Sequence, residues 1–168
     1  LSAINETFRT EIGTGTSVSW PNRPNIVGAP RNDGVTAQIN QIEGSIGYIE
    51  YFFATSTGTA VALLQNASGE FVAPSEEAGK AALAGAVVSG DDLRVWVTDP
   101  KDPLAYPIVT YTWMLFFREH GNERLQEALR NFVAWAMKDG QAMAGDLGYI
   151  ALPEDMVQRV LAQSANIR

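Results

Sequence analysis

The sequence contains no cysteine and only one histidine. Without thiols the chain cannot form a disulfide, a zinc–thiolate cluster or a cysteine nucleophile. The single histidine, His120, lies among charged and turn-forming residues, which favours a solvated loop residue over a general base or a metal ligand. The G-x-S-x-G elbow and the Walker phosphate loop are also missing. We therefore expect no catalytic residues, no metal and no cofactor in this chain.

Long hydrophobic runs and an excess of positive charge are lacking too. The apolar runs at 48–54 and 107–117 fall well short of the roughly 20 residues that a membrane helix needs. The chain carries 12 Lys and Arg against 19 Asp and Glu, a net charge of −7. This charge argues against a nucleic-acid surface, which needs clustered basic residues. It does not exclude a small anion, because a pocket responds to local donors.

Several short motifs have a simple structural interpretation. The neighbouring acids Glu76–Glu77 and Asp91–Asp92 diverge on a helix or a strand, so solvated termini are favoured over a catalytic or cation-binding pair. The sequon at 66–68 is interpreted as a turn. The segment 28–34, GAPRNDG, resembles an anion-binding loop at a helix start, but a capped helix start needs the same residues and is favoured.

The spacing of apolar residues predicts helices alternating with strands. Helices are expected over 1–12, from Asn32 or Asp33 to Ile42, over 75–86 with Ser75 as cap, over 125–138, and from Pro153 onward. Strands are expected over 45–54, over 108–117, in short pieces at 16–20, 91–97 and 145–152, and as a hairpin over 63–72. This alternation predicts an α/β fold with at least partly parallel sheet.

Blocks of sequence in a fixed order carry a family resemblance. They include GTGT with VSWP at 13–21, GAPRNDGV at 28–35, GSIGYIEY at 44–51, GEFVAPS at 69–75, YPIVT at 106–110 and LGYIALP at 147–153. Together they resemble the phosphate-binding proteins of bacterial ABC phosphate transporters. The resemblance covers essentially the whole chain and corresponds to the second half of such a protein.

The resemblance implies a periplasmic-binding-protein fold with two α/β lobes and mixed, mostly parallel sheets. Residues 1–101 would belong to the second lobe, 102–107 would form the hinge crossover, and 108–168 would complete the first lobe. It implies inorganic phosphate as ligand, a membrane permease as partner, and an extracytoplasmic location, periplasmic or cell-surface. The family's main phosphate ligands would lie upstream of Leu1, in an N-terminal half that this chain lacks. In this half, Tyr48, Thr110 and Tyr111 are the candidates for the cleft.

Two other functions stay open at this point. A phosphate-ester hydrolase of the same fold would need a metal or an activated nucleophile, and a sensory or adhesive surface protein would have lost the ligand. Because Leu1 opens directly into a helical pattern, the chain is expected to be a processed or excised piece. We expect it to fold properly only beside an N-terminal half, since unpartnered sheet edges and apolar faces aggregate.

Overall fold

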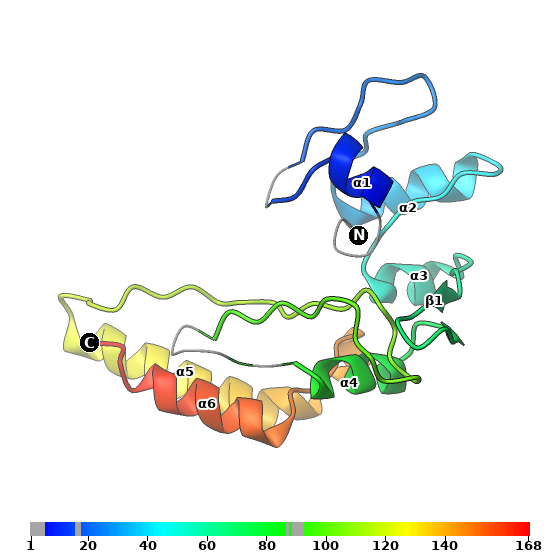
Figure 1. The fold of residues 1–168 in the computed structure, drawn as a ribbon. Helices are drawn as coiled ribbons and strands as arrows, with labels where there is room; N and C mark the ends of the chain where they lie inside the picture. The colour runs from blue at the N-terminus through cyan, green and yellow to red at the C-terminus, as the bar shows by residue number, and fades with distance from the viewer. Residues whose placement is uncertain (1–5, 16–17, 87, 89–92) are drawn as a thin grey trace.

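The structure is a computed structural model that describes residues 6–15, 18–86, 88 and 93–168. Helices dominate these residues, and two short strands form a hairpin between them (Figure 1). The predicted strands at 16–20 and 91–97 are described only in part, because residues 16–17 and 91–92 fall outside the described residues. The acidic pair Asp91 and Asp92 is therefore also outside them. In chain order the elements are α1 (Glu6–Glu11), α2 (Arg31–Gln41), α3 (Tyr51–Thr57), β1 (Leu64–Gln65), β2 (Phe71–Val72), α4 (Glu76–Ala84), α5 (Glu123–Ala142), η1 (Gly145–Leu147) and α6 (Glu154–Ser164).

Helices α5 and α6 form an antiparallel pair at one end of the molecule (Figure 1). The first begins after Asn122, whose side-chain oxygen accepts from the backbone N–H groups of Arg124 and Leu125 at 3.0 and 3.3 Å. The second begins after Pro153, a residue suited to a helix start because its missing N–H would be unpaired there anyway. Val133 of α5 and Met156 of α6 are buried. The prediction of both helices is confirmed.

Helix α4 also follows its prediction. Ser75 caps it by accepting a hydrogen bond from the Ala78 N–H at 3.1 Å. Glu76 and Glu77 stand exposed in the first turn, where negative charge complements the helix dipole, and Glu76 pairs with Lys80 one turn later. These neighbouring acids therefore have the structural role that the sequence indicated.

The predicted hairpin is present as β1 and β2, which pair antiparallel with Leu64 opposite Val72 and Gln65 opposite Phe71. It is the one sheet among the described residues. The chain thus combines helices with sheet, but the parallel strands expected from the sequence do not pair here. Residues 108–117 run extended without joining a ladder, and the pieces of 16–20 and 91–97 that are described form no strand.

The strand predicted over 45–54 is wrong in its second half. Residues 45–50 are extended but unpaired, and the chain then turns into α3. The helix ends at Gly58, which has the left-handed φ of 66° that glycine adopts freely. A short apolar and aromatic run fits a buried strand and a helix equally well, so periodicity could not separate them. The extended piece predicted at 145–152 is likewise replaced at its start by η1.

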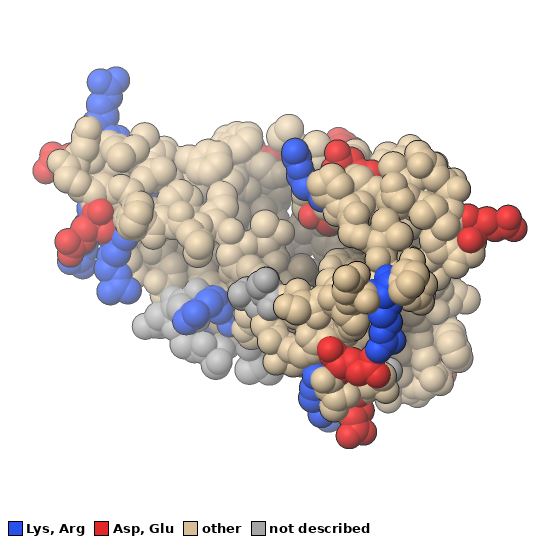
Figure 2. All heavy atoms as spheres, turned by 90° about the horizontal axis from the view of Figure 1, so that it is seen from above, with Lys and Arg blue, Asp and Glu red and all other residues tan. Residues whose placement is uncertain are grey.

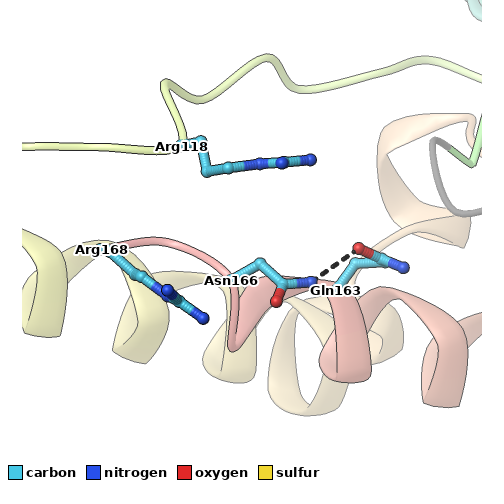
Figure 3. Close-up of a pocket in the computed structure, with 4 residues that line it drawn as sticks. All are labelled: Arg118, Gln163, Asn166 and Arg168. Atoms are coloured by element: carbon cyan, nitrogen blue, oxygen red, sulfur yellow. Dashed lines mark hydrogen bonds between the residues drawn. The ribbon is translucent and has the colours of Figure 1, made fainter.

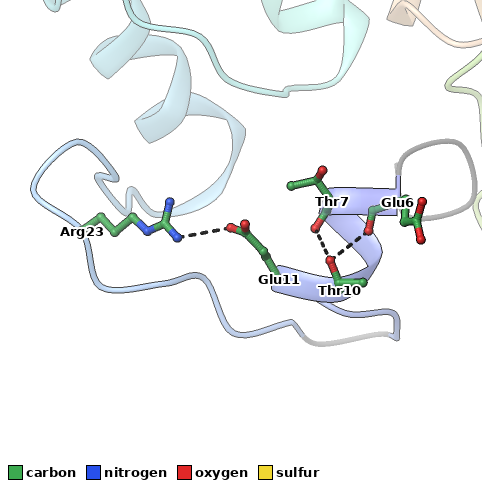
Figure 4. Close-up of polar contacts among 5 residues, drawn as sticks. All are labelled: Glu6, Thr7, Thr10, Glu11 and Arg23. Atoms are coloured by element: carbon green, nitrogen blue, oxygen red, sulfur yellow. Dashed lines mark hydrogen bonds and ion pairs between the residues drawn. The ribbon is translucent and has the colours of Figure 1, made fainter.

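The first two helices lie apart from the α5–α6 pair (Figure 1). Helix α1 is short, and the ion pair between Glu11 and Arg23, at 3.2 Å, ties it to the following loop (Figure 4). Helix α2 begins at Arg31, and the side-chain cap favoured for the helix start at 28–34 is absent. The Asn32 side chain instead accepts from the Glu50 N–H at 3.1 Å, which joins the start of α2 to the start of α3.

The chain exposes more surface than a compact protein of its size. Its accessible area is 12099 Å² for a mass of 18.2 kDa, whereas a compact monomer of this mass has about 8,000 Å². Large apolar side chains contribute to the difference, with Ile46 97% and Leu115 92% exposed. The face in Figure 2 carries scattered charged side chains, and most of it is uncharged. Ile46 and Leu115 lie in the extended segments 45–50 and 108–117, which have the composition of strands but lack neighbouring strands to pair with among the described residues.

Candidate functional site

The side chain of Asn66 joins the β-hairpin to the predicted crossover. It is only 6% exposed. Its amide nitrogen donates toward the carbonyl oxygens of Asp102, Pro103 and Ala105, at 3.2, 3.0 and 3.1 Å. Its oxygen accepts from the N–H groups of Ser68 and Glu70 and from the Ser68 hydroxyl. The interpretation of the sequon as a turn is confirmed, because the amide nitrogen is used inside the fold.

The loop that Asn66 holds is a tight turn of its own. The Asp102 side chain accepts from the Leu104 N–H at 2.8 Å, and the Asp102 carbonyl accepts from the Ala105 N–H at 3.0 Å. Immediately afterwards the Tyr106 N–H donates to the carbonyl of Ala78 in α4 at 3.1 Å. The residues predicted as a hinge crossover are therefore anchored on one side to the hairpin and on the other to α4.

The three cleft candidates lie in two different surroundings. Tyr48 is 67% exposed and stacks on Trp20, with ring centroids 6.3 Å apart. Thr110 is exposed and donates to the carbonyl of its neighbour Tyr111 at 3.2 Å. Partial burial raises the pKa of the Tyr111 phenol, and the negative charge of Asp155 raises that pKa further. Among the described residues, Tyr48 makes no hydrogen bond or ring contact with Thr110 or Tyr111.

The two extended segments that flank the crossover lie side by side. The indole N–H of Trp113 donates to the carbonyl of Leu93 at 3.2 Å, and the rings of Trp96 and Trp113 lie 5.4 Å apart. Val95, the residue before Trp96, is almost fully buried. Side chains, rather than a backbone ladder, hold these segments together in the described part of the chain.

His120 is not the solvated residue that the sequence indicated. Its Nε2 atom is buried and has no hydrogen-bond partner among the described residues. The ring meets Phe117 edge to face, with centroids 6.1 Å apart, and the backbone carbonyl accepts from Gln126 at 2.6 Å. The prediction failed because the Phe117 ring contacts the imidazole and the His120 backbone N–H binds the carbonyl of Arg168, and neither contact is visible in the local composition.

A polar pocket of about 280 Å³ lies beside the end of α6. Arg118 enters it from the extended segment, and Gln163, Asn166 and Arg168 enter it from the other side (Figure 3). Sequence reasoning missed this group because Arg118 and Arg168 are distant in the chain. In the described part of the chain, no three or more histidine and acidic side chains gather as a metal site, and no helix is long and apolar enough to span a bilayer.

Known proteins resemble the chain over nearly its whole length. A phosphate-binding protein, PstS, of Pasteurella multocida is 34% identical over 164 residues, 97% of this chain and 47% of the relative. The PstS of Xylella fastidiosa is 33% identical over 167 residues, 99% of this chain and 45% of the relative. Nearly the whole chain is homologous to phosphate-binding proteins. The resemblance found in the sequence blocks is thereby confirmed.

A PstS of Methanocaldococcus jannaschii is 31% identical over 173 residues, 94% of this chain and 44% of the relative. The chain spans about half the length of the relatives it matches. No protein-family model matches the sequence. Asn66, Arg118 and Arg168 lie outside the sequence blocks that carry the resemblance. Their roles were identified from the structure.

Proposed function

We propose that this chain forms the C-terminal half of an extracytoplasmic protein that binds inorganic phosphate and delivers it to the membrane permease of an ABC transporter. The observation that carries the proposal is the similarity of 94–99% of the chain to about half of several proteins named for phosphate binding. Those names also support binding rather than catalysis as the activity, and a location outside the cytoplasm.

The proposed architecture has two α/β lobes. Residues 1–101 belong to the second lobe, 102–107 cross between the lobes, and 108–168 complete the first. The anchored turn at Asp102, fixed by Asn66, supports a defined crossing point. A crossing point that is held in place sets the direction in which the chain enters the next lobe.

The missing sheet partners are proposed to come from the N-terminal half of the protein. Residues 45–50 and 108–117 are extended, rich in β-branched and aromatic residues, and unpaired. A strand covered on both faces has this composition, and its backbone N–H and C=O groups need neighbouring strands. Mixed, mostly parallel sheets would therefore form when the rest of the protein docks on these segments, and the exposed side chains of Ile46 and Leu115 would be covered.

The main phosphate ligands are proposed to lie in that other half. Tyr48, Thr110 and Tyr111 would line the cleft from this side, since all three stand on the extended segments or next to them. A phosphate held by backbone N–H groups, hydroxyls and a guanidinium is removed from water yet remains paired. Closure of two lobes would then exclude water from the ion.

Calorimetric titration of the full-length protein with inorganic phosphate tests the proposal. We expect saturable binding of phosphate at the principal site and no turnover of a chromogenic phosphate ester. A full-length protein that releases no heat with phosphate would refute the binding function. Hydrolysis of the ester would favour the enzyme alternative instead.

A further inference from the structure

The pocket beside α6 combines two positive charges with two amides. Its lining consists of Arg118, Gln163, Asn166 and Arg168, and no acidic side chain takes part (Figure 3). A volume of about 280 Å³ suits a small ion better than a cofactor. In a chain with a net charge of −7, such a positive pocket runs against the overall charge.

Neither arginine of the pocket has an ion-pair partner. Within the described residues, the ion pairs are Arg23 with Glu11 and Lys80 with Glu76. The nearby acids Glu119 and Glu123 make no ion pair with Arg118 or Arg168. An anion between the two guanidinium groups would remove their mutual repulsion, and the guanidinium fork matches a carboxylate or phosphate oxygen pair.

Neutralising the end of α6 does not account for both arginines. Cations near a helix C-terminus stabilise its last carbonyl groups. Neither Arg118 nor Arg168 donates to those carbonyl groups, and Arg130 of α5 donates to the carbonyl of Ile167, three residues beyond the end of α6, at 2.6 Å. The side chains of Arg118 and Arg168 make no hydrogen bond within the described part of the chain, so their donors face the pocket solvent.

The amides give the pocket both a donor and an acceptor. Asn166 Nδ2 donates to Gln163 Oε1 at 3.0 Å, which fixes the two side chains against each other (Figure 3). Gln163 Nε2 is left as a donor and Asn166 Oδ1 as an acceptor, neither with another partner among the described residues. Such a set can bind the oxygens of an anion and also accept a proton that the anion carries.

Backbone hydrogen bonds fix the positions of the two arginines. The Arg168 N–H donates to the Arg118 carbonyl at 2.7 Å, and the His120 N–H donates to the Arg168 carbonyl. These two bonds tie the end of the described chain to residues 118–120. The pocket is therefore built on paired backbone and not on two independent loops.

The geometry points to a second anion site, for a small tetrahedral oxyanion such as inorganic phosphate or sulfate, between Arg118, Arg168 and Gln163. The site lies entirely within this chain and is separate from the main phosphate ligands proposed for the other half. It does not depend on the proposed transport function.

Nuclear magnetic resonance of the full-length protein tests the site. The protein first receives one molar equivalent of phosphate, enough to occupy a tight principal site, and sodium sulfate is then added against sodium chloride at equal ionic strength. We expect saturable shifts of the Arg118 side-chain Nε–H and the Gln163 amide with sulfate only. In R118Q the sulfate affinity should fall about tenfold or more, as expected for loss of a charge-assisted hydrogen bond.

The matched control is K138Q, which also removes one positive charge. Lys138 stands on α5, about 20 Å along the helix axis from Glu123, the first residue of that helix. The sulfate affinity of K138Q should equal that of the unchanged protein. R118K keeps the charge, and we expect it to retain binding that is weaker than with arginine, which also shows that the site tolerates substitution. Shifts that chloride reproduces, that persist in R118Q, or that K138Q weakens equally would overturn the site. Loss of principal phosphate binding with intact sulfate shifts would refute only the proposed transport function.

Discussion

The side-chain amide of Asn66 lies 3.1 Å from the carbonyl oxygen of Ala105, 39 residues further along the chain. This contact links the β-hairpin to the segment at which the chain is proposed to cross between lobes. A buried amide that satisfies carbonyl groups of a turn is costly to remove, because those groups cannot then reach water. The crossing segment therefore depends on one side chain outside it.

Replacing Asn66 with alanine should lower the free energy of unfolding of the full-length protein by about 2 kcal/mol or more, since several buried polar groups lose their partner. Urea denaturation followed by fluorescence measures the change. Gln65, the exposed neighbour on β1, provides the control, and Q65A should change the stability by less than about 0.5 kcal/mol. Equal, small effects of N66A and Q65A would contradict the role of Asn66.

Alanine substitutions at Gly148 and Gly44 distinguish the cost of backbone strain from the cost of a steric clash. Both have a φ of 76°, but a Cβ on Gly148 would lie 2.6 Å from the Cβ of Phe52, whereas nothing lies within 4 Å of a Cβ on Gly44. G44A should cost about 1 kcal/mol, the penalty for a side chain in the left-handed region. G148A should cost clearly more, because α3 must also move away. Thermal unfolding of the two variants compares them directly, and a smaller loss in G148A would show that α3 does not pack there.

The start of α4 predicts a specific pH dependence. Two hydrogen bonds hold the pKa of the Glu77 carboxyl below its usual value. The larger effect comes from the Glu77 backbone N–H and the smaller from the Ser75 side chain. A lowered pKa in the folded state stabilises the fold above the unfolded pKa, and this contribution is lost as the pH falls through the folded value. The Glu77 pKa, followed by carbon-detected magnetic resonance, should rise toward its usual value in S75A.

The same variant should reduce stability at neutral pH by about 1 kcal/mol, the typical value of a serine helix cap. S56A, in the exposed last turn of α3, is the control and should be nearly neutral, because Ser56 bonds only to a carbonyl of its own helix. An unchanged Glu77 pKa together with unchanged stability in S75A would contradict the capping geometry.

Local rules predicted helices α4, α5 and α6. Ser75 identified the start of α4, and the apolar spacing from Leu125 onward identified α5, because caps and helical periodicity are properties of neighbouring residues. The hairpin at 63–72 was also predictable, since Asn66 and Gly69 mark a turn between apolar residues. In each case the signal and the structure lie within one short stretch of chain.

Contacts between distant residues were beyond this reasoning. The alternatives for 45–54 differ only in what the segment packs against, and Asn32 was assigned to its own helix although it binds Glu50. Arg118 and Arg168 meet at the pocket because the Arg168 N–H donates to the Arg118 carbonyl, 50 residues earlier in the chain. Periodicity contains no information on such pairings, which depend on how separate elements meet.

The central claim is that these residues are half of a fold and need the other half to bury their extended, apolar segments. Differential scanning calorimetry of the isolated 168-residue chain, checked for monodispersity, tests it most directly. The large exposed area predicts a broad or missing heat-absorption peak and association of the chain, while the full-length protein melts cooperatively. A monodisperse monomer that melts in one sharp cooperative transition would contradict the claim.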